Sequence, residues 1–312
     1  MADLTSEFLG IKSPNPFWLA SAPPTDKAYN VNRAFEAGWG GAVWKTLGEA
    51  GPPIVNVSGP RYSALHSNER RLIGFNNIEL ISDRPLETNL EEIRQVKRDW
   101  PDRALVVSVM LPMNEKAWAD HVPMIEDTGA DALELNFGCP HGMSERGMGA
   151  AVGQVPEYIQ MATEWCKQAA SIPVIVKLTP NVASIVPPAK AAKDGGADAV
   201  SLINTVNSIM RVNYDTLTMY PTTDGMGTHG GYCGEAVKPI ALNMVAEIAR
   251  TAETGNIPIS GIGGITDWRD AVDFLALGAS NVQVCTAAMV YGFKIIDDLT
   301  DGLSTFLDDK GM

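Results

Sequence analysis

A cysteine, Cys139, directly follows a glycine and begins a loop that holds four more glycines between residues 142 and 153. A thiol in such a place can exchange a proton with a bound substrate, which is general acid–base catalysis, and the glycines would let the loop hinge. A lone cysteine is more often a small packing residue. The spacing alone therefore leaves both roles open for Cys139. It favours packing for Cys166 and Cys285 and a tight glycine turn for Cys233.

Two lysines stand at the ends of short apolar runs: Lys45 follows Val43-Trp44, and Lys177 follows residues 173–176. A buried ammonium is costly unless it meets an anion or a carbonyl. Two of them indicate a shared electron-rich ligand, such as the N1–C2 edge of a flavin, where a cation stabilises the reduced, anionic ring. The alternative is a flavin-free phosphate-binding barrel, such as an aldolase, with Lys177 as its Schiff-base lysine.

Three asparagines lie in comparable positions: Asn136 after an apolar run, Asn204 beside Thr205, and Asn77 in a long connecting segment. A side-chain amide both donates and accepts hydrogen bonds, as the edge of a polar heterocycle does. Each asparagine alone is more typical of a turn. Together the three predict a site for a small polar heterocycle.

A phosphate site is predicted where Gly263-Gly264 follow one apolar run and Thr286 follows the next. Glycine lets backbone N–H groups approach an anion at a helix N-terminus, and the last two strand ends of a barrel commonly form such a site. The simpler interpretation is a tight turn before a capped helix.

The elements that would position these residues alternate strictly between strand and helix. Most of the expected strands are continuous apolar runs, as strands buried on both faces require. They cover residues 16–21, 42–46, 104–110, 132–137, 173–178, 199–204, 257–261 and 282–286. Amphipathic patterns predict helices over residues 29–37, 86–98, 115–127, 156–170, 183–194, 236–251, 267–277 and 291–306.

Eight such units predict one (β/α)8 barrel domain over residues 1–312, with long loops near 47–85, 140–155 and 206–235. An open, doubly wound sheet is the alternative fold. Residues 225–230 match the spacing G-x-G-x-x-G, but they do not follow a strand. Because the dinucleotide-binding motif needs a strand before it and a helix after it, a Rossmann-type nicotinamide site is rejected.

The composition narrows the class of protein. The formal net charge of −13 argues against nucleic acid and anionic membranes as partners. No apolar run reaches the roughly 20 residues that span a bilayer, and the N-terminus lacks a secretory pattern, so a cytoplasmic protein is expected. The four cysteines form no Cys-x-x-Cys and the histidines no ligand spacing, so no metal is expected.

These residues resemble the FMN barrel shared by class 1 dihydroorotate dehydrogenases and dihydropyrimidine dehydrogenases. The resemblance rests on residues 136–140, Lys177, Asn204-Thr205, Gly263-Gly264 and Lys45-Thr46, and it covers nearly the whole chain. It implies a flavin-dependent oxidoreductase that acts on a CH–CH bond.

Two segments favour the pyrimidine branch of this family. Residues 139–149 with Gly153-Gln154 are similar to the active-site loop of dihydropyrimidine dehydrogenases. Dihydroorotate enzymes tend to carry asparagine in place of His141, and a Met-Gly-Leu-Pro-Asn-like loop, which receives the orotate carboxylate, in place of residues 74–80. The resemblance thus implies interconversion of uracil or thymine with the 5,6-dihydro form, and dihydroorotate oxidation is the alternative.

The resemblance also implies a role for each site residue. Cys139 would exchange the C5 proton while flavin N5 exchanges hydride with C6. The residues that would hold the pyrimidine are Asn77, Asn136, Asn204 and Thr205. Those that would line FMN are Ala20, Ser21, Lys45, Thr46, Lys177, Gly234, Gly263, Gly264, Cys285 and Thr286.

This chain shows no cluster-binding cysteines, so either a partner subunit delivers electrons to the flavin, or the chain is a truncated form, or the electron acceptor differs from that of the relatives. The resemblance implies a partner subunit that carries FAD, an NAD(P)H site and iron–sulfur clusters, in a homodimer or a hetero-oligomer.

Overall fold

The computed structural model describes residues 2–52, 54–140 and 142–312, so His141 lies outside the described residues. Within them, eight parallel strands close a barrel in the order β10-β17-β18-β3-β4-β7-β8-β9. The strands are β3 (Phe17–Leu19), β4 (Gly41–Leu47), β7 (Ala104–Val109), β8 (Ala132–Asn136), β9 (Val174–Lys177), β10 (Ala199–Leu202), β17 (Ile259–Ile262) and β18 (Asn281–Val284). Every residue of these strands is buried, which explains their continuous apolar runs and confirms the predicted (β/α)8 barrel.

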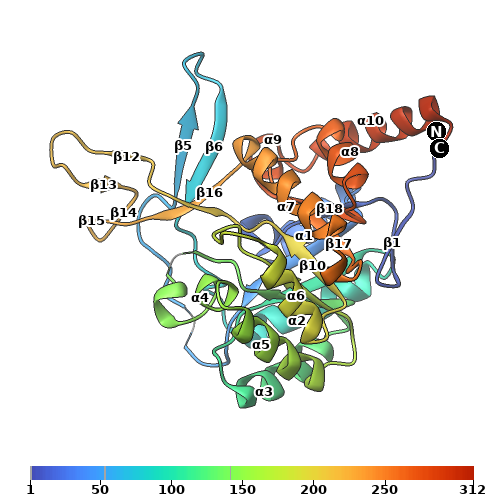
Figure 1. The fold of residues 1–312 in the computed structure, drawn as a ribbon, viewed down its shortest axis with the longest axis horizontal. Helices are drawn as coiled ribbons and strands as arrows, with labels where there is room; N and C mark the ends of the chain where they lie inside the picture. The colour runs from blue at the N-terminus through green and yellow to red at the C-terminus, as the bar shows by residue number, and fades with distance from the viewer. Residues whose placement is uncertain (1, 53, 141) are drawn as a thin grey trace.

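Helices pack around the barrel and cover its outer face (Figure 1). They are α1 (Ala28–Ala37), α2 (Leu86–Asp99), α3 (Glu115–Glu126), α4 (Ala150–Gly153), α5 (Pro156–Ala169), α6 (Val186–Asp194), α7 (Lys238–Arg250), α8 (Trp268–Ala276), α9 (Thr286–Tyr291) and α10 (Ile295–Lys310). Short 3-10 turns are η1 (Pro23–Thr25), η2 (Ser144–Arg146), η3 (Glu235–Val237) and η4 (Ala252–Thr254). In the described residues, no helix is both long and apolar enough to cross a membrane.

The last βα unit differs from the prediction. The expected strand over 282–286 ends at Val284, and Thr286 already begins α9. The single helix expected over 291–306 is instead the pair α9 and α10, because Gly292 takes a φ of +79°, which an α-helix cannot accommodate. This extra short helix places Thr286 at a helix start beside the barrel mouth.

An antiparallel hairpin closes the end of the barrel at which the strands begin. It is formed by β1 (Ser6–Phe8) and β2 (Ile11–Ser13). Phe8 packs edge-on against Trp18 at a ring-centroid distance of 5.8 Å, within a cluster of buried apolar side chains that includes Val43 and Ile175. Mostly apolar side chains therefore fill this end of the barrel.

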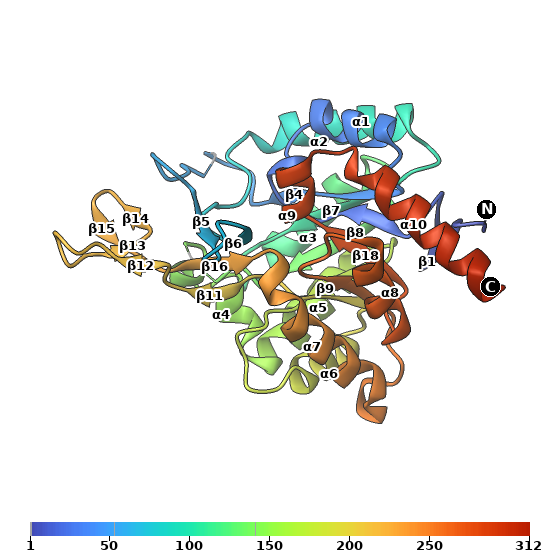
Figure 2. The same ribbon diagram turned by 90° about the horizontal axis from the view of Figure 1, so that it is seen from above.

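Two long βα loops, predicted as loops without strands, together form a second sheet. Its order is β11-β16-β6-β5, from β5 (Tyr62–His66), β6 (Leu72–Asn77), β11 (Val206–Ser208) and β16 (Gly230–Cys233). The segment between β11 and β16 forms an arm of two-residue strands: β12 (Arg211–Val212), β13 (Met219–Tyr220), β14 (Thr222–Thr223) and β15 (Met226–Gly227). Figures 1 and 2 show the arm and the β5–β6 hairpin projecting away from the barrel. Gly225 occupies a hairpin turn in this arm, so the rejected glycine motif has no helix after it.

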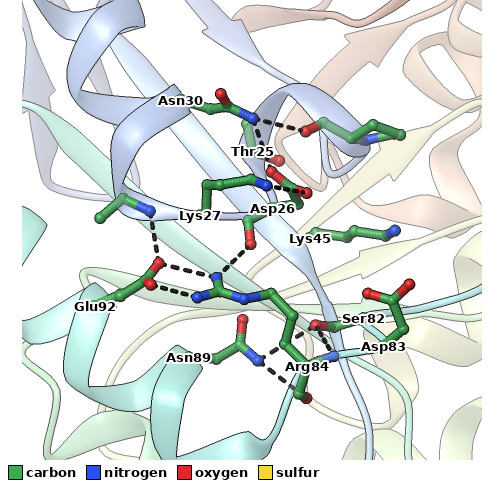
Figure 3. A network of polar contacts seen from close by, with 12 residues as sticks. Thr25, Asp26, Lys27, Asn30, Lys45, Ser82, Asp83, Arg84, Asn89 and Glu92 are labelled. Carbon is green, nitrogen blue, oxygen red and sulfur yellow. Dashed lines mark hydrogen bonds and ion pairs between the residues drawn. The ribbon is translucent and has the colours of Figure 1, made fainter. Parts of the chain in front are cut away.

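A polar network fastens the segment after β3 to helix α2 (Figure 3). The guanidinium of Arg84 forms an ion pair with the Glu92 carboxylate, and its Nη1 also donates to the Asp26 carbonyl at 2.9 Å. Glu92 Oε2 accepts the backbone N–H of Ala28 at 2.8 Å. The start of α1 is thereby held against α2, and the adjacent residues Ala22 and Pro23 are fixed at the barrel mouth.

This network predicts an acid-sensitive contribution to stability. Hydrogen bonding from Arg84 holds the pKa of Glu92 below its usual value of 4.5. The contribution is present above pH 4.5 and is lost as the pH falls through the lower pKa of the folded state. We expect Glu92→Gln to lower the free energy of unfolding by about 1–2 kcal/mol at pH 7 and by much less at pH 3.5, measured by urea unfolding. The exposed neighbour Glu91 is the matched control, and an equal pH dependence for Glu91→Gln would contradict the assignment.

Candidate active site

A cavity lies at the carboxyl ends of the barrel strands, with about 1110 Å³ of empty space including its open mouth. This is the face on which barrels of this type carry their active sites. Every site residue predicted from the sequence lines it, namely Ala20, Ser21, Lys45, Thr46, Asn77, Asn136, Cys139, Lys177, Asn204, Thr205, Gly234, Gly263, Gly264, Cys285 and Thr286. The structure thus brings the predicted set together in one place.

Hydrogen bonds fix the orientation of the amides. Asn204 Nδ2 donates to Asn136 Oδ1 at 3.0 Å, and Asn136 Nδ2 donates to Thr46 Oγ1 at 2.9 Å. The Thr46 hydroxyl also lies 2.9 Å from Ser108 Oγ and 3.2 Å from Ser21 Oγ. A chain of side chains from several strands therefore presents the two amides in one arrangement, which pre-organises them for a ligand.

The residue before Cys139, Gly138, must be glycine for a steric reason. A Cβ at Gly138 would lie 2.3 Å from Asn204 Cβ and 2.4 Å from Asn204 Nδ2. Only glycine therefore lets the end of β8 pass so close to the asparagine that follows β10. The sequence Asn136-Phe137-Gly138-Cys139 thus leads directly from one amide, past the other, to a cysteine that lines the same cavity.

The loop after Cys139 is hydrogen-bonded back to the backbone of Cys139. The Cys139 carbonyl accepts Ala150 N–H at 3.0 Å and the Ser144 hydroxyl at 2.6 Å. The Cys139 side chain packs against an apolar cluster of Ile81, Met110 and Met143. Cys139 is thus held between the cavity and a methionine-rich patch, where a closed loop would keep water away from the thiol.

Glu79 lines the cavity and was not among the predicted residues. Its carboxylate accepts Lys45 Nζ at 2.6 Å and Arg61 Nη1 at 3.2 Å, and its side chain is only 9% exposed. The Tyr62 hydroxyl donates to it at 3.5 Å, and burial, with the charge of Glu79, raises the pKa of that tyrosine. The sequence signal for Glu79 was its place two residues after Asn77, since alternate residues of an extended segment point to the same side.

Lys177 also has a carboxylate partner that the sequence analysis missed. Its Nζ lies 3.4 Å from Oε1 of Glu134, which is fully buried in the middle of β8. Among the described residues, this is the one polar contact of the Lys177 ammonium. Because an ammonium has three donors, Lys177 keeps donors for a ligand in the cavity. A charged residue inside the apolar run 132–135 was the signal for such a pair.

One end of the cavity offers backbone donors. Gly263 and Gly264 have φ angles of +129° and +75°, and α9 begins at Thr286. In the described part of the chain, the N–H groups of these three residues donate to no backbone carbonyl. Unpaired N–H groups at a helix start and a glycine turn fit a phosphate. These donors and Lys177 lie in one cavity, and they fit the needs of a phosphate-bearing cofactor such as the FMN that the resemblance implies.

The other cysteines are poor candidates for proton transfer. Burial raises the pKa of Cys285 to about 12, with a further increase from Cys233, and burial likewise raises the pKa of Cys233. Cys166 lies inside α5, where burial raises its pKa to about 12. Burial therefore disfavours the reactive thiolate form of all three cysteines.

Comparisons with known proteins agree with this geometry. The sequence model of the dihydroorotate dehydrogenase family matches residues 3–307. The NAD-dependent dihydropyrimidine dehydrogenase subunit PreA of Escherichia coli K12 is 41% identical over 309 residues, which is 99% of this chain and 74% of that protein. The chloroplastic dihydropyrimidine dehydrogenase (NADP(+)) of Arabidopsis thaliana is 42% identical over 313 residues, covering 98% of this chain and 73% of the relative.

More distant relatives share the fold over the same length. The catalytic subunit of dihydroorotate dehydrogenase B (NAD(+)) from Pyrococcus abyssi is 36% identical over 310 residues, 99% of this chain and 95% of that subunit. The crystal structure of Eimeria tenella DHODH with ferulenol superposes with a TM-score of 0.79 at 18% identity, covering 99% of this chain and 86% of that one, which supports the fold. The predicted family and the predicted enzyme class are confirmed. The chain belongs to the dihydroorotate dehydrogenase family and is an oxidoreductase that acts on a CH–CH bond.

Proposed function

We propose that this chain binds FMN and interconverts uracil or thymine with the 5,6-dihydropyrimidine. The proposal rests on one cavity. In the described residues, it is lined by backbone N–H groups that donate to no carbonyl, by Lys177 paired with Glu134, by the two oriented amides and by Cys139. When bound, FMN supplies the hydride chemistry at C6 of the pyrimidine.

The residues of the chain perform the remaining tasks. Asn77, Asn136, Asn204 and Thr205 bind the polar edges of the ring. Asn204 is held by hydrogen bonds with Asn136 and with the Thr205 N–H, and Asn77 is held by the Gly231 carbonyl. Cys139 gives its proton to C5 during reduction and takes one from C5 in the reverse direction. Lys177, with Gly263, Gly264 and Thr286, holds FMN in the cavity, next to Ala20, Ser21, Lys45, Thr46, Gly234 and Cys285.

The charge of the cavity favours a neutral pyrimidine over orotate. Orotate carries a carboxylate, which needs an unpaired cation or several free N–H donors. Lys45 is already paired with Glu79 at 2.6 Å, and Arg61 is paired with the same carboxylate at 3.2 Å, so neither of these cations is unpaired. The flavin-free aldolase hypothesis finds no support among the relatives, which are dehydrogenases.

We also propose an electron partner of the predicted kind, a subunit with FAD, an NAD(P)H site and iron–sulfur clusters. PreA is named as a subunit of an NAD-dependent enzyme, which supports a division of labour between chains. A homodimer of this chain and a hetero-oligomer with the partner are both compatible with the proposal.

An anaerobic flavin spectrum of the purified chain tests the function. Dihydrouracil is expected to bleach the flavin absorption band, while dihydroorotate at the same concentration leaves it unchanged. Bleaching by dihydroorotate alone would move the protein to the orotate branch. A protein that binds no FMN when supplied with it would refute the cofactor and the reaction together.

A further inference from the structure

A buried carboxylate lies beneath the cavity without lining it. Glu134 is on β8, inside the barrel, with an exposed fraction of 0%. Its register partners are Ser108 on β7 and Ile175 on β9. Lys177 lies two residues further along β9, where it is in register with Ser201 on β10. Glu134 therefore lies between the apolar barrel floor and the residues that would touch a cofactor.

The contacts of Glu134 divide between its two oxygens. Oε2 accepts the Ser201 hydroxyl at 2.8 Å and Gln283 Nε2 at 3.0 Å. Gln283 Nε2 also donates to Ser260 Oγ at 3.0 Å, so both amide hydrogens of Gln283 are used. Oε1 has no hydrogen bond in the described residues and faces Lys177 Nζ at 3.4 Å. One oxygen is thus anchored by neutral donors, and the other is left to the charge of the lysine.

Lys177 and Gln283 both line the cavity, and both depend on Glu134 for their placement. In a site shielded from water, opposite charges at this distance interact far more strongly than they do at the surface. The carboxylate therefore offsets much of the positive charge that Lys177 presents to the cavity.

We propose that Glu134 is a positioning residue whose charge, acting through Lys177, lowers the reduction potential of the bound flavin. This inference rests on the proposed FMN site. A cation beside the N1–C2 edge stabilises the reduced, anionic flavin ring. Because Glu134 partly neutralises that cation, it makes the flavin a stronger reductant than Lys177 alone would allow.

The test is Glu134→Gln, which keeps an oxygen able to accept from Ser201 and Gln283 but removes the charge. Midpoint potentials of the FMN-loaded wild type and variant are measured anaerobically against reference dyes. We expect the ratio of reduced to oxidised flavin at a fixed potential to rise at least tenfold in the variant, a shift of about 30 mV for a two-electron couple.

A purely structural role makes a different prediction, namely weaker FMN binding or lower stability without a change of potential. Ser201→Ala is the matched control, because it removes a neutral hydrogen bond to the same carboxylate. Its potential is expected to stay close to that of the wild type. An unchanged or lower potential in Glu134→Gln, with FMN still bound, overturns the proposal.

A second variant covers the case in which Glu134→Gln does not fold. Lys177→Met/Glu134→Gln removes both charges and leaves the net charge of the pair at zero, as in the wild type. Its potential is expected to lie only slightly below the wild-type value, because Glu134 offsets much, but not all, of the charge of Lys177. A fall of more than about 30 mV would mean that most of the Lys177 charge acts on the flavin without compensation by Glu134, which overturns the inference. If the wild type itself binds no FMN, the proposed function fails first and this inference fails with it.

Discussion

Replacing Cys139 with alanine is expected to slow the reduction of bound FMN by dihydrouracil about 100- to 10,000-fold, the usual contribution of a positioned general acid or base. FMN should stay bound, because Cys139 packs against the methionine cluster and is not among the residues proposed to hold FMN. Stopped-flow absorbance in the absence of oxygen measures both the rate and the flavin content.

Two variants control this experiment. Cys139→Ser should recover part of the rate, since a hydroxyl can occupy the same place but is a far weaker acid. Cys166→Ala removes a thiol that is buried in α5, and its reaction should keep the wild-type rate. Near-normal turnover of Cys139→Ala would remove the thiol from the mechanism while leaving the FMN site intact.

Replacing Lys177 with methionine is expected to be the most damaging change to the fold and to cofactor binding. It leaves Glu134 as a buried carboxylate without its cation, and breaking a buried pair in this way costs about 3–5 kcal/mol. The free energy of unfolding of the apoprotein in urea measures this loss, and FMN titration measures the lost affinity.

The double variant Lys177→Met/Glu134→Gln separates the two effects. Removing both charges should restore most of the stability, because no uncompensated charge remains in the barrel. FMN affinity should remain reduced, because the donor toward the cavity is gone. Full recovery of affinity in the double variant would show that Lys177 does not contact the cofactor.

The barrel and the members of the site followed from the sequence for a physical reason. A buried parallel strand must be apolar along its whole length, so polar residues at its end stand out. Asn136 and Lys177 were recognisable in this way, and a closed barrel necessarily brings strand ends together. Strict alternation of strand and helix then fixed the order of the strands.

The missed features depend on contacts between distant segments. Glu134 lies within a strand, and nothing in its neighbours along the chain shows that Lys177, on the next strand, compensates its charge. The second sheet pairs β6 with β16, whose residues Asn77 and Gly231 are far apart in the sequence. Short strands rich in glycine and asparagine carry little periodic signal, so pairing at this range could not be predicted.

The sheet made by β6 and β16 also determines how the cavity can open. Asn77 Nδ2 donates to the Gly231 carbonyl at 3.0 Å, and a Cβ at Gly231 would lie 2.1 Å from Thr205 Oγ1. Residues from two long loops thus form one rigid sheet beside the mouth of the cavity. We expect this sheet to remain in place throughout the catalytic cycle, so that substrate and product pass the glycine-containing segment 142–149 instead. One side of the active site is therefore rigid, and the loop that follows Cys139 is the part that must move for exchange of substrate and product.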